Sequence, residues 1–217
     1  MSLPLQRRHL LSLLACAALV CGWPRASEAS ERDVVLDRVK KARTGLKTLR
    51  ADFKQERNIS LLATRVKSTG TIAMVRPDRL RWQLHAPDAV TYWIGPEGVA
   101  IATKEGVSKI GREAAGRFAA VLSDLMQLLA GDIDSLGQRY RLEAKRGPKY
   151  TTLTATPKEA ALKKQLTRLT LRLKNDQLWA MDRVVIIEKN GDQSDIVFSN
   201  PERNVAIDPK TMKPPKR

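Results

Sequence analysis

The sequence predicts a mainly β (α+β) fold in which a single curved antiparallel sheet lies under a helical lid. Between residues 50 and 200, apolar and charged residues alternate over many short segments, as in strands with one dry and one wet face. Two other segments carry apolar residues at helical spacing. Because the dry face of the sheet must be shielded from water, these two helical stripes are the candidates for its cover.

The first 29 residues have the pattern of a secretory signal peptide. Arg7 and Arg8 precede the apolar run Leu10–Cys21, and small residues lead to an expected cleavage after Ala29. The run is shorter than the roughly 20 residues that a membrane helix needs. An uncleaved N-terminal anchor is the alternative. The residues around Cys16 match a lipoprotein cleavage box only in part, and the sequence does not separate Sec from twin-arginine export.

Cleavage would change the chemistry available to the protein. It removes Cys16 and Cys21, so thiolate catalysis and cysteine-ligated metals are excluded from the mature chain. It also removes three arginines and one glutamate, so that the net charge of +16 becomes +14. Behind a signal peptide, the acidic partners of so basic a chain are anionic lipids and glycolipids. We therefore expect a periplasmic protein that does not bind nucleic acid.

No linker divides residues 30–205, and we expect one domain over residues 30–208 followed by a basic, disordered tail over residues 209–217. Helices are expected at Ser30–Leu49 and Glu113–Ala130, with Gly131 ending the second. Strands are expected at Arg50–Ile59, Val66–Arg76, Arg79–His85, Val90–Ile94, Val99–Thr103, Val107–Ile110, Arg139–Lys145, Arg168–Lys174, Leu178–Lys189 and Ser194–Ser199. Pro77-Asp78 and Asn190-Gly191 are typical of tight turns.

Catalytic patterns are absent from the mature sequence. Its one histidine, His85, falls on the polar face of its strand, where a solvated side chain is expected. There is no glycine-rich phosphate loop, no nucleophile elbow and no metalloprotease motif. We therefore expect no enzyme activity, no cofactor and no metal.

Several motifs, taken in order, resemble those of the LolA family of outer-membrane lipoprotein carriers. They are Phe53-Lys54-Gln55, Gly70-Thr71-Ile72, Arg76-Pro77-Asp78-Arg79-Leu80-Arg81-Trp82 with Pro87, Leu128–Asp132, Leu153–Pro157, Gly191–Ser194 and Phe198–Asn200 with Asn204. The resemblance implies an incomplete β-barrel of the LolA/LolB type, closed by helices around a hydrophobic cavity. It also implies a periplasmic carrier that accepts acylated lipoproteins from an inner-membrane ABC transporter and hands them to an outer-membrane acceptor. We expect it to act as a monomer.

Arg76 is the residue to which the resemblance gives a specific role. Alternation from Ile72 and Met74 places Arg76 on the cavity side, where a charge is costly unless it is hydrogen-bonded. By resemblance, Arg76 would bind backbone carbonyls of the lid and hold the empty carrier shut. The alternative is a strand-end arginine beside a turn.

The candidate cavity residues are apolar side chains of the strands and of the second helix. They are Phe53, Ile72, Met74, Leu80, Trp82, Leu84, Trp93, Phe118, Leu122, Leu125, Leu169, Leu171, Leu173 and Phe198. For each of them alone, ordinary core packing explains an apolar side chain equally well. The lipid interpretation depends on there being more apolar strand faces than two helices can cover.

Departures from the family pattern leave the cargo open. Leu80 stands where many members have an aromatic residue, the turn at Ile94–Val99 differs, and the net charge is high for the family. A glycolipid or another lipid is therefore also compatible with the sequence. Three different roles fit the sequence less well. A lipid-sensing envelope regulator usually carries a second domain, and an anchored outer-membrane acceptor needs a convincing lipoprotein box, which Cys16 and Cys21 do not supply. A basic nucleic-acid binder is contradicted by the signal peptide and by charges that are spread over most strands.

Overall fold

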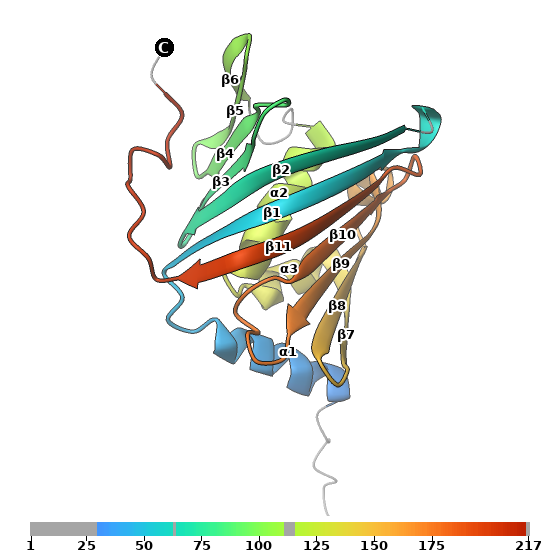
Figure 1. The fold of residues 1–217 in the computed structure, drawn as a ribbon. Coiled ribbons are helices and arrows are strands. Elements are labelled where there is room, and N and C mark those ends of the chain that lie inside the picture. The colour runs from blue at the N-terminus through green and yellow to red at the C-terminus, as the bar shows by residue number, and fades with distance from the viewer. Residues whose placement is uncertain (1–29, 63, 111–115, 216–217) are drawn as a thin grey trace, which may run out of the picture.

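A single antiparallel sheet of 11 strands forms the body of the protein (Figure 1). The computed structural model describes residues 30–62, 64–110 and 116–215. The strands follow the order β6-β5-β4-β3-β2-β1-β11-β10-β9-β8-β7. The sheet is curved and does not close on itself, which confirms the predicted fold class. The expected signal peptide lies outside the described residues.

Short connections join most neighbouring strands, as the turn signals predicted. The strands are β1 (Thr48–Ile59), β2 (Thr64–Val75), β3 (Arg79–Leu84), β4 (Thr91–Gly95), β5 (Gly98–Thr103), β6 (Gly106–Ile110), β7 (Tyr140–Arg146), β8 (Tyr150–Pro157), β9 (Leu166–Lys174), β10 (Arg183–Glu188) and β11 (Gln193–Arg203). The helices are α1 (Glu31–Ala42), η1 (Ser60–Leu62), α2 (Gly116–Leu129), α3 (Ile133–Arg139) and α4 (Ala160–Lys163).

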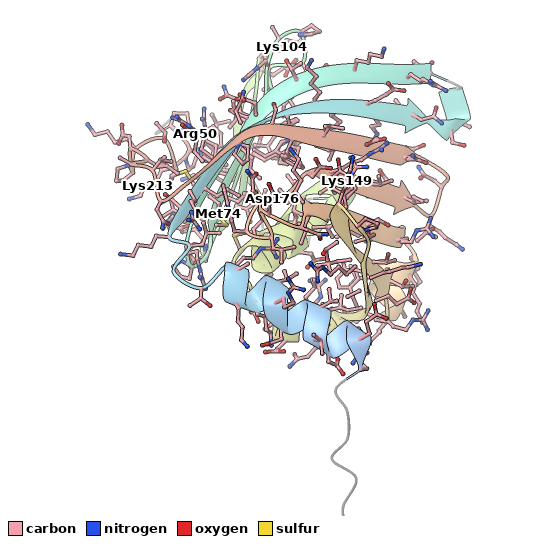
Figure 2. All side chains as sticks on the ribbon, turned by 60° about the horizontal axis from the view of Figure 1, so that its bottom comes forward. Arg50, Met74, Lys104, Lys149, Asp176 and Lys213 are labelled. Carbon is pink, nitrogen blue, oxygen red and sulfur yellow. The ribbon has the colours of Figure 1, made fainter. Side chains whose placement is uncertain are left out.

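The two edges of the sheet determine where the helical cover lies. β6 and β7 are the opposite edge strands, yet they are consecutive in sequence. The chain between them, residues 111–139, must therefore cross from one edge of the curved sheet to the other. It carries α2 and α3, and α2 packs on β3 and β4 while α3 packs on β7. Figures 1 and 2 show α1 along the lower edge of the sheet, where it packs on β7, and Figure 1 shows α2 behind the central strands.

Alternation gives the sheet one buried and one wet face. In β8 the even-numbered positions are half-buried and the odd-numbered ones buried, and in β1 the odd-numbered positions from Leu49 to Gln55 are likewise the buried ones. The register keeps the faces aligned between strands: Ile72 pairs with Trp82, and Met74 with Leu80. The buried side chains of the strands and of α1, α2 and α3 form one apolar core.

The first helix is shorter than predicted. α1 begins after Ser30, whose hydroxyl accepts a hydrogen bond from the Asp33 amide, and it ends at Ala42. Gly45 then takes a left-handed conformation with φ of 78°, which turns the chain into β1. Leu46 and Leu49 are buried as expected, but they belong to the connection and to the first strand. Apolar spacing alone could not separate these two arrangements.

Two strand predictions also need correction. Tyr150–Pro157 forms β8, which the sequence did not indicate, because threonine and alanine occupy most of its positions and conceal the alternation. The strand predicted from Leu178 starts only at Arg183. Residues 175–182 instead form a turn that buries Ala180 and Met181.

Part of the C-terminal segment contacts the sheet. Residues 211–214 lie near the outer face of β4 and β5, and Met212 is only 4% exposed. The Trp93 indole nitrogen donates a hydrogen bond to the Thr211 carbonyl oxygen at 2.9 Å. The composition of the segment suggested a solvated tail, but one methionine and one aromatic partner are enough to hold it against the sheet.

Gly70 permits the closest packing in the sheet. A Cβ atom at this position would lie 2.1 Å from the Gln83 carbonyl oxygen and 2.3 Å from Cζ of Phe53. The ring of Phe53 therefore covers the bare backbone of β2, and it stacks on Trp82 with ring centroids 4.1 Å apart.

We expect Gly70→Ala to destabilise the protein by about 3 kcal/mol or more, because the blocking atom is backbone and cannot rotate away. The matched control is Gly137→Ala in α3, where a Cβ would lie 3.9 Å from Leu142, an ordinary contact. That variant should be neutral or more stable by up to about 1 kcal/mol, since alanine favours helix. Urea unfolding measures both, and equal stabilities of the two variants would contradict the packing assigned to Gly70.

Candidate functional site

The buried face of the sheet brings together most of the predicted cavity residues. Eleven of them belong to one apolar core: Phe53, Ile72, Met74, Leu80, Trp82, Leu122, Leu125, Leu169, Leu171, Leu173 and Phe198. They come from strands β1, β2, β3, β9 and β11 and from α2. In this arrangement α2 lies against the buried face of the sheet, called the inner face below. Leu122 and Leu125 of α2 are fully buried.

An aromatic cluster lies in the middle of this face. Phe53 and Trp82 are stacked, and Phe198 approaches both rings with centroids 6.1 Å away. The three residues come from β1, β3 and β11, so the cluster spans the centre of the sheet. Such rings offer a large apolar area in a fixed position.

Three predicted cavity residues behave differently. Leu84 is on the inner face but half-buried, beyond the aromatic cluster. Trp93 was wrongly assigned to the cavity: it pairs with Arg81 and so lies on the wet face, against the C-terminal segment. Its short strand did not reveal which face would be buried. The side chain of Phe118 lies outside the described residues.

Arg76 lies at the end of β2 beside the connection from α1 to β1. Its guanidinium donates hydrogen bonds to the carbonyl oxygens of Arg43 and Leu46, both at 3.3 Å. Its own amide donates to the Lys47 carbonyl at 2.9 Å. Because Arg43 is the C-cap of α1, the cation lies at the negative end of the helix dipole. The side chain thus connects the sheet to α1, and the residue is exposed, not enclosed in the core.

A buried ionic cluster connects α2 to the opposite edge of the sheet. Asp124 of α2 is fully buried and accepts hydrogen bonds from Arg139 and from the Tyr140 hydroxyl. Burial raises the pKa of Asp124, while both hydrogen bonds and the nearby guanidinium act in the opposite direction. Burial and the adjacent carboxylate raise the pKa of Tyr140, which keeps its hydroxyl protonated as the donor. These polar contacts therefore hold α2 to α3 and β7.

Arg43 is a second cation under the helical cover. Its side chain is 1% exposed, and burial lowers the pKa of the guanidinium to about 10. It therefore stays charged at neutral pH. It lies beside Gly131, at the junction of α2 and α3. A charge in this position makes the cover of the sheet partly polar.

Polar groups also line the inner face beyond the aromatic cluster. Arg57 of β1 forms ion pairs with Glu188 at 2.9 Å and with Asp192 at 3.2 Å. The Ser60 amide donates to Asp192, and these contacts lower the pKa of that carboxyl. Gln55, one step closer to the cluster, is 8% exposed. The inner face thus changes from apolar to polar along β1.

The described residues show neither a group of metal ligands nor a membrane-spanning helix. Within residues 30–62, 64–110 and 116–215, no three histidine, cysteine or acidic side chains are grouped as metal ligands. None of the helices in those ranges has the length and apolar character that crossing a membrane requires.

The family model of the outer membrane lipoprotein carrier protein LolA matches residues 44–214. The chain belongs to the LolA family. The match covers the sheet, the helices α2 and α3, and the part of the C-terminal segment that contacts β4. Membership in the LolA family supports a lipid- or lipoprotein-binding, carrier-like role. Comparison with curated proteins gives no match.

Several solved structures are similar to this chain at low sequence identity. A crystal structure of MucB is 14% identical with a TM-score of 0.50, and the match covers 87% of this chain and 64% of that one. A LolA superfamily protein from Nitrosomonas europaea is 9% identical with a TM-score of 0.47, covering 86% and 99%. A DUF1329 family protein from Desulfovibrio piger is 14% identical with a TM-score of 0.49, covering 83% and 97%. In the Pseudomonas aeruginosa MucA/MucB complex, this chain spans 60% of the matched chain.

The polar residues of the interior were missed by sequence reasoning, although a signal for some of them was present. Gln55 continues the inner-facing series that runs through Ala51 and Phe53. Asp124 interrupts the apolar stripe of α2. A polar residue at a position where the pattern demands an apolar one marks a special site. Arg43 gave no such signal, because the predicted helix ran on past it.

We expect Asp124→Ala to destabilise the protein by about 2–4 kcal/mol, because the Arg139 charge and the Tyr140 hydroxyl would lose their buried acceptor. The matched control is Asp134→Ala, which removes the ion pair between Lys40 and a carboxylate that is 82% exposed. That change should stay within about 0.5 kcal/mol of the wild type. Urea unfolding followed by tryptophan fluorescence measures both. Similar losses in the two variants would show that Asp124 does not fasten α2.

Proposed function

We propose that this protein is a periplasmic carrier that shields the acyl chains of lipoproteins and transfers them from the inner to the outer membrane. One observation carries the proposal: eleven of the fourteen predicted cavity residues lie in one apolar core on one face of the sheet, and the segment that covers this face bridges the two free edges of an open sheet. A cover attached in this way can leave the face without breaking any strand pairing. An inner-membrane ABC transporter as donor and an outer-membrane acceptor follow from the family resemblance, and we infer a monomer.

The energies of cover and cargo are comparable. α2 buries Val121, Leu122, Leu125, Met126 and Leu129. At roughly 1.5–3 kcal/mol for each side chain, these five contribute about 8–15 kcal/mol. Shielding one chain of about 16 carbons is worth roughly 12 kcal/mol, at about 0.8 kcal/mol per CH₂. Lipid can therefore replace α2 on the inner face at little net cost, which is what reversible loading requires.

The first test of this function is mass spectrometry of organic extracts from the mature protein, purified out of its native periplasm. We expect acylated lipoprotein, because its chains would be trapped on the inner face during purification. Recovery of a defined glycolipid instead would identify the alternative cargo. Protein that is free of lipid and also fails to bind a fluorescent fatty-acid probe would overturn the carrier proposal.

We further propose that Arg76 sets the balance between holding and releasing lipid. Its bonds to the Arg43 and Leu46 carbonyls form a link between sheet and α1 that favours the arrangement described here. If lipid entry breaks these bonds, they reform on release and help to expel the cargo. The Arg76 hydrogen bonds hold α1 to the sheet, while the Asp124 cluster holds α2.

We expect Arg76→Leu to slow release of a preloaded fluorescent lipid into acceptor vesicles by about fivefold, because loss of its two hydrogen bonds would weaken the empty, covered arrangement by about 1 kcal/mol. Stability should fall by less than this, by no more than about 0.5 kcal/mol, since the residue is exposed. The matched control is Arg79→Leu, which removes an ion pair to Glu97 on the wet face and should leave release unchanged. If Arg76→Leu lowered the free energy of unfolding by as much as it changed the free energy of lipid release, the result would count against the proposal.

A further inference from the structure

A hollow lies on the inner face just beyond the aromatic cluster. It has a volume of about 150 Å³ and is lined by Gln55, Arg57, Val66, Ser68, Leu84, Asp88 and Tyr92. The hollow lies where β3 ends. Leu84, the last residue of β3, pairs with Gly70 of β2, so the part of β2 from Thr64 to Thr69 has no β3 residue paired with it. Figure 1 shows β1 and β2 running on together to η1 beyond the end of β3. The hollow is therefore a consequence of unequal strand lengths.

The strand register puts these polar side chains next to the apolar face. Gln55 follows Phe53 by two residues and pairs with Ser68 across the sheet. Tyr92 pairs with Trp82 on the next strand. A chain lying on the aromatic cluster would thus have one end at the hollow. At about 30 Å³ per water molecule, the hollow has room for roughly five waters or one small polar group.

Gln55, which lines this hollow, carries a buried polar atom that has no partner among the described residues. Its carbonyl oxygen Oε1 is buried and accepts no hydrogen bond from any described residue. An unsatisfied buried acceptor lowers stability, and such groups are uncommon in native proteins. In this position the oxygen is turned away from the open hollow, but rotation of the terminal amide of Gln55 would bring it there, where a ligand that donates a hydrogen bond would satisfy it.

The charges around the hollow favour a ligand without negative charge. Among the described charged residues that line it or bind its lining, Arg57 is the cation and Asp88, Glu188 and Asp192 are the anions. Arg57 is already bound by two of these carboxylates. Ser68 donates its hydroxyl to the third, Asp88. The rim is thus locally acidic although the whole chain has a net charge of +16.

We propose that this hollow is a head-group subsite, in which Gln55 accepts a hydrogen bond from an uncharged hydroxyl or amide N–H next to the acyl chains. The subsite rests on the proposed carrier function, since it places the chains of the same ligand on the inner face. It would select ligands by their head group and disfavour those with a phosphate. The apolar face alone could not distinguish these from uncharged ligands with the same acyl chains.

The test compares three ligands with the same 16-carbon chain, as displacers of a fluorescent fatty-acid probe from the wild-type protein. They are a monoacylglycerol, the methyl ester that lacks a donor, and the acylglycerol phosphate that adds negative charge. We expect the monoacylglycerol to bind about five- to tenfold more tightly than either of the others. Equal affinities for all three would overturn the subsite and leave the carrier function standing. Failure of all three to displace the probe would overturn both.

Gln55→Met isolates the acceptor, because methionine has nearly the same size without a carbonyl. We expect it to abolish the preference by weakening the monoacylglycerol alone, and to raise the urea midpoint or leave it unchanged. The matched control is Gln83→Met, the same substitution in β3 at a position on the opposite face of the sheet. This variant should keep the preference for the monoacylglycerol. If Gln55→Met lowered the midpoint and weakened all ligands equally, Gln55 would be a structural residue and the proposal would be wrong.

Discussion

The structure depends on one constraint: an open sheet of 11 strands with one continuous apolar face that must be kept from water. An exposed apolar surface of that extent is not tolerated in a monomeric soluble protein. The chain meets the constraint with the segment between the edge strands β6 and β7, which has to cross the open side in order to connect them. The position of α2 therefore follows from the strand order as much as from its own apolar stripe. α1 completes the cover at the β7 edge.

The sheet and its cover are held together by different forces. Within the sheet, backbone pairing and close packing such as that of Phe53 on Gly70 leave little freedom. The cover is attached to the sheet by apolar contacts together with a small number of polar ones, namely the Asp124 cluster for α2 and Arg76 for α1. Hydrogen bonds and ion pairs are directional and are lost over a short displacement, whereas apolar contacts can be replaced by those of another apolar group. This division suits the proposed exchange of the cover for a lipid ligand.

Much of this fold could be predicted because strand alternation is a strong local signal. Leu80, Trp82 and the leucines Leu169 to Leu173 fell on the correct face for that reason. The failures have physical causes. In β8 the inner positions include Thr151 and Ala155, which are too small or too polar to mark a buried face. Trp93 lies in a strand of five residues, and only the register with β3 shows that it points to the wet side. Met212 could not be placed, because its contact with the sheet comes from far away in the sequence.

The polar part of the candidate site was harder to predict than the apolar part, and the reason bears on function. The pattern of apolar residues predicts which side chains are buried, but it does not predict which buried polar groups lack a hydrogen-bond partner. Gln55 was visible in the sequence as part of a motif, yet its meaning depends on the hollow that forms where β3 stops. A core selected for stability alone would place an apolar residue at this position, since removing an unpaired buried acceptor is neutral or favourable. That the chain retains a glutamine between the aromatic cluster and the acidic rim is therefore best explained by a ligand that reaches it.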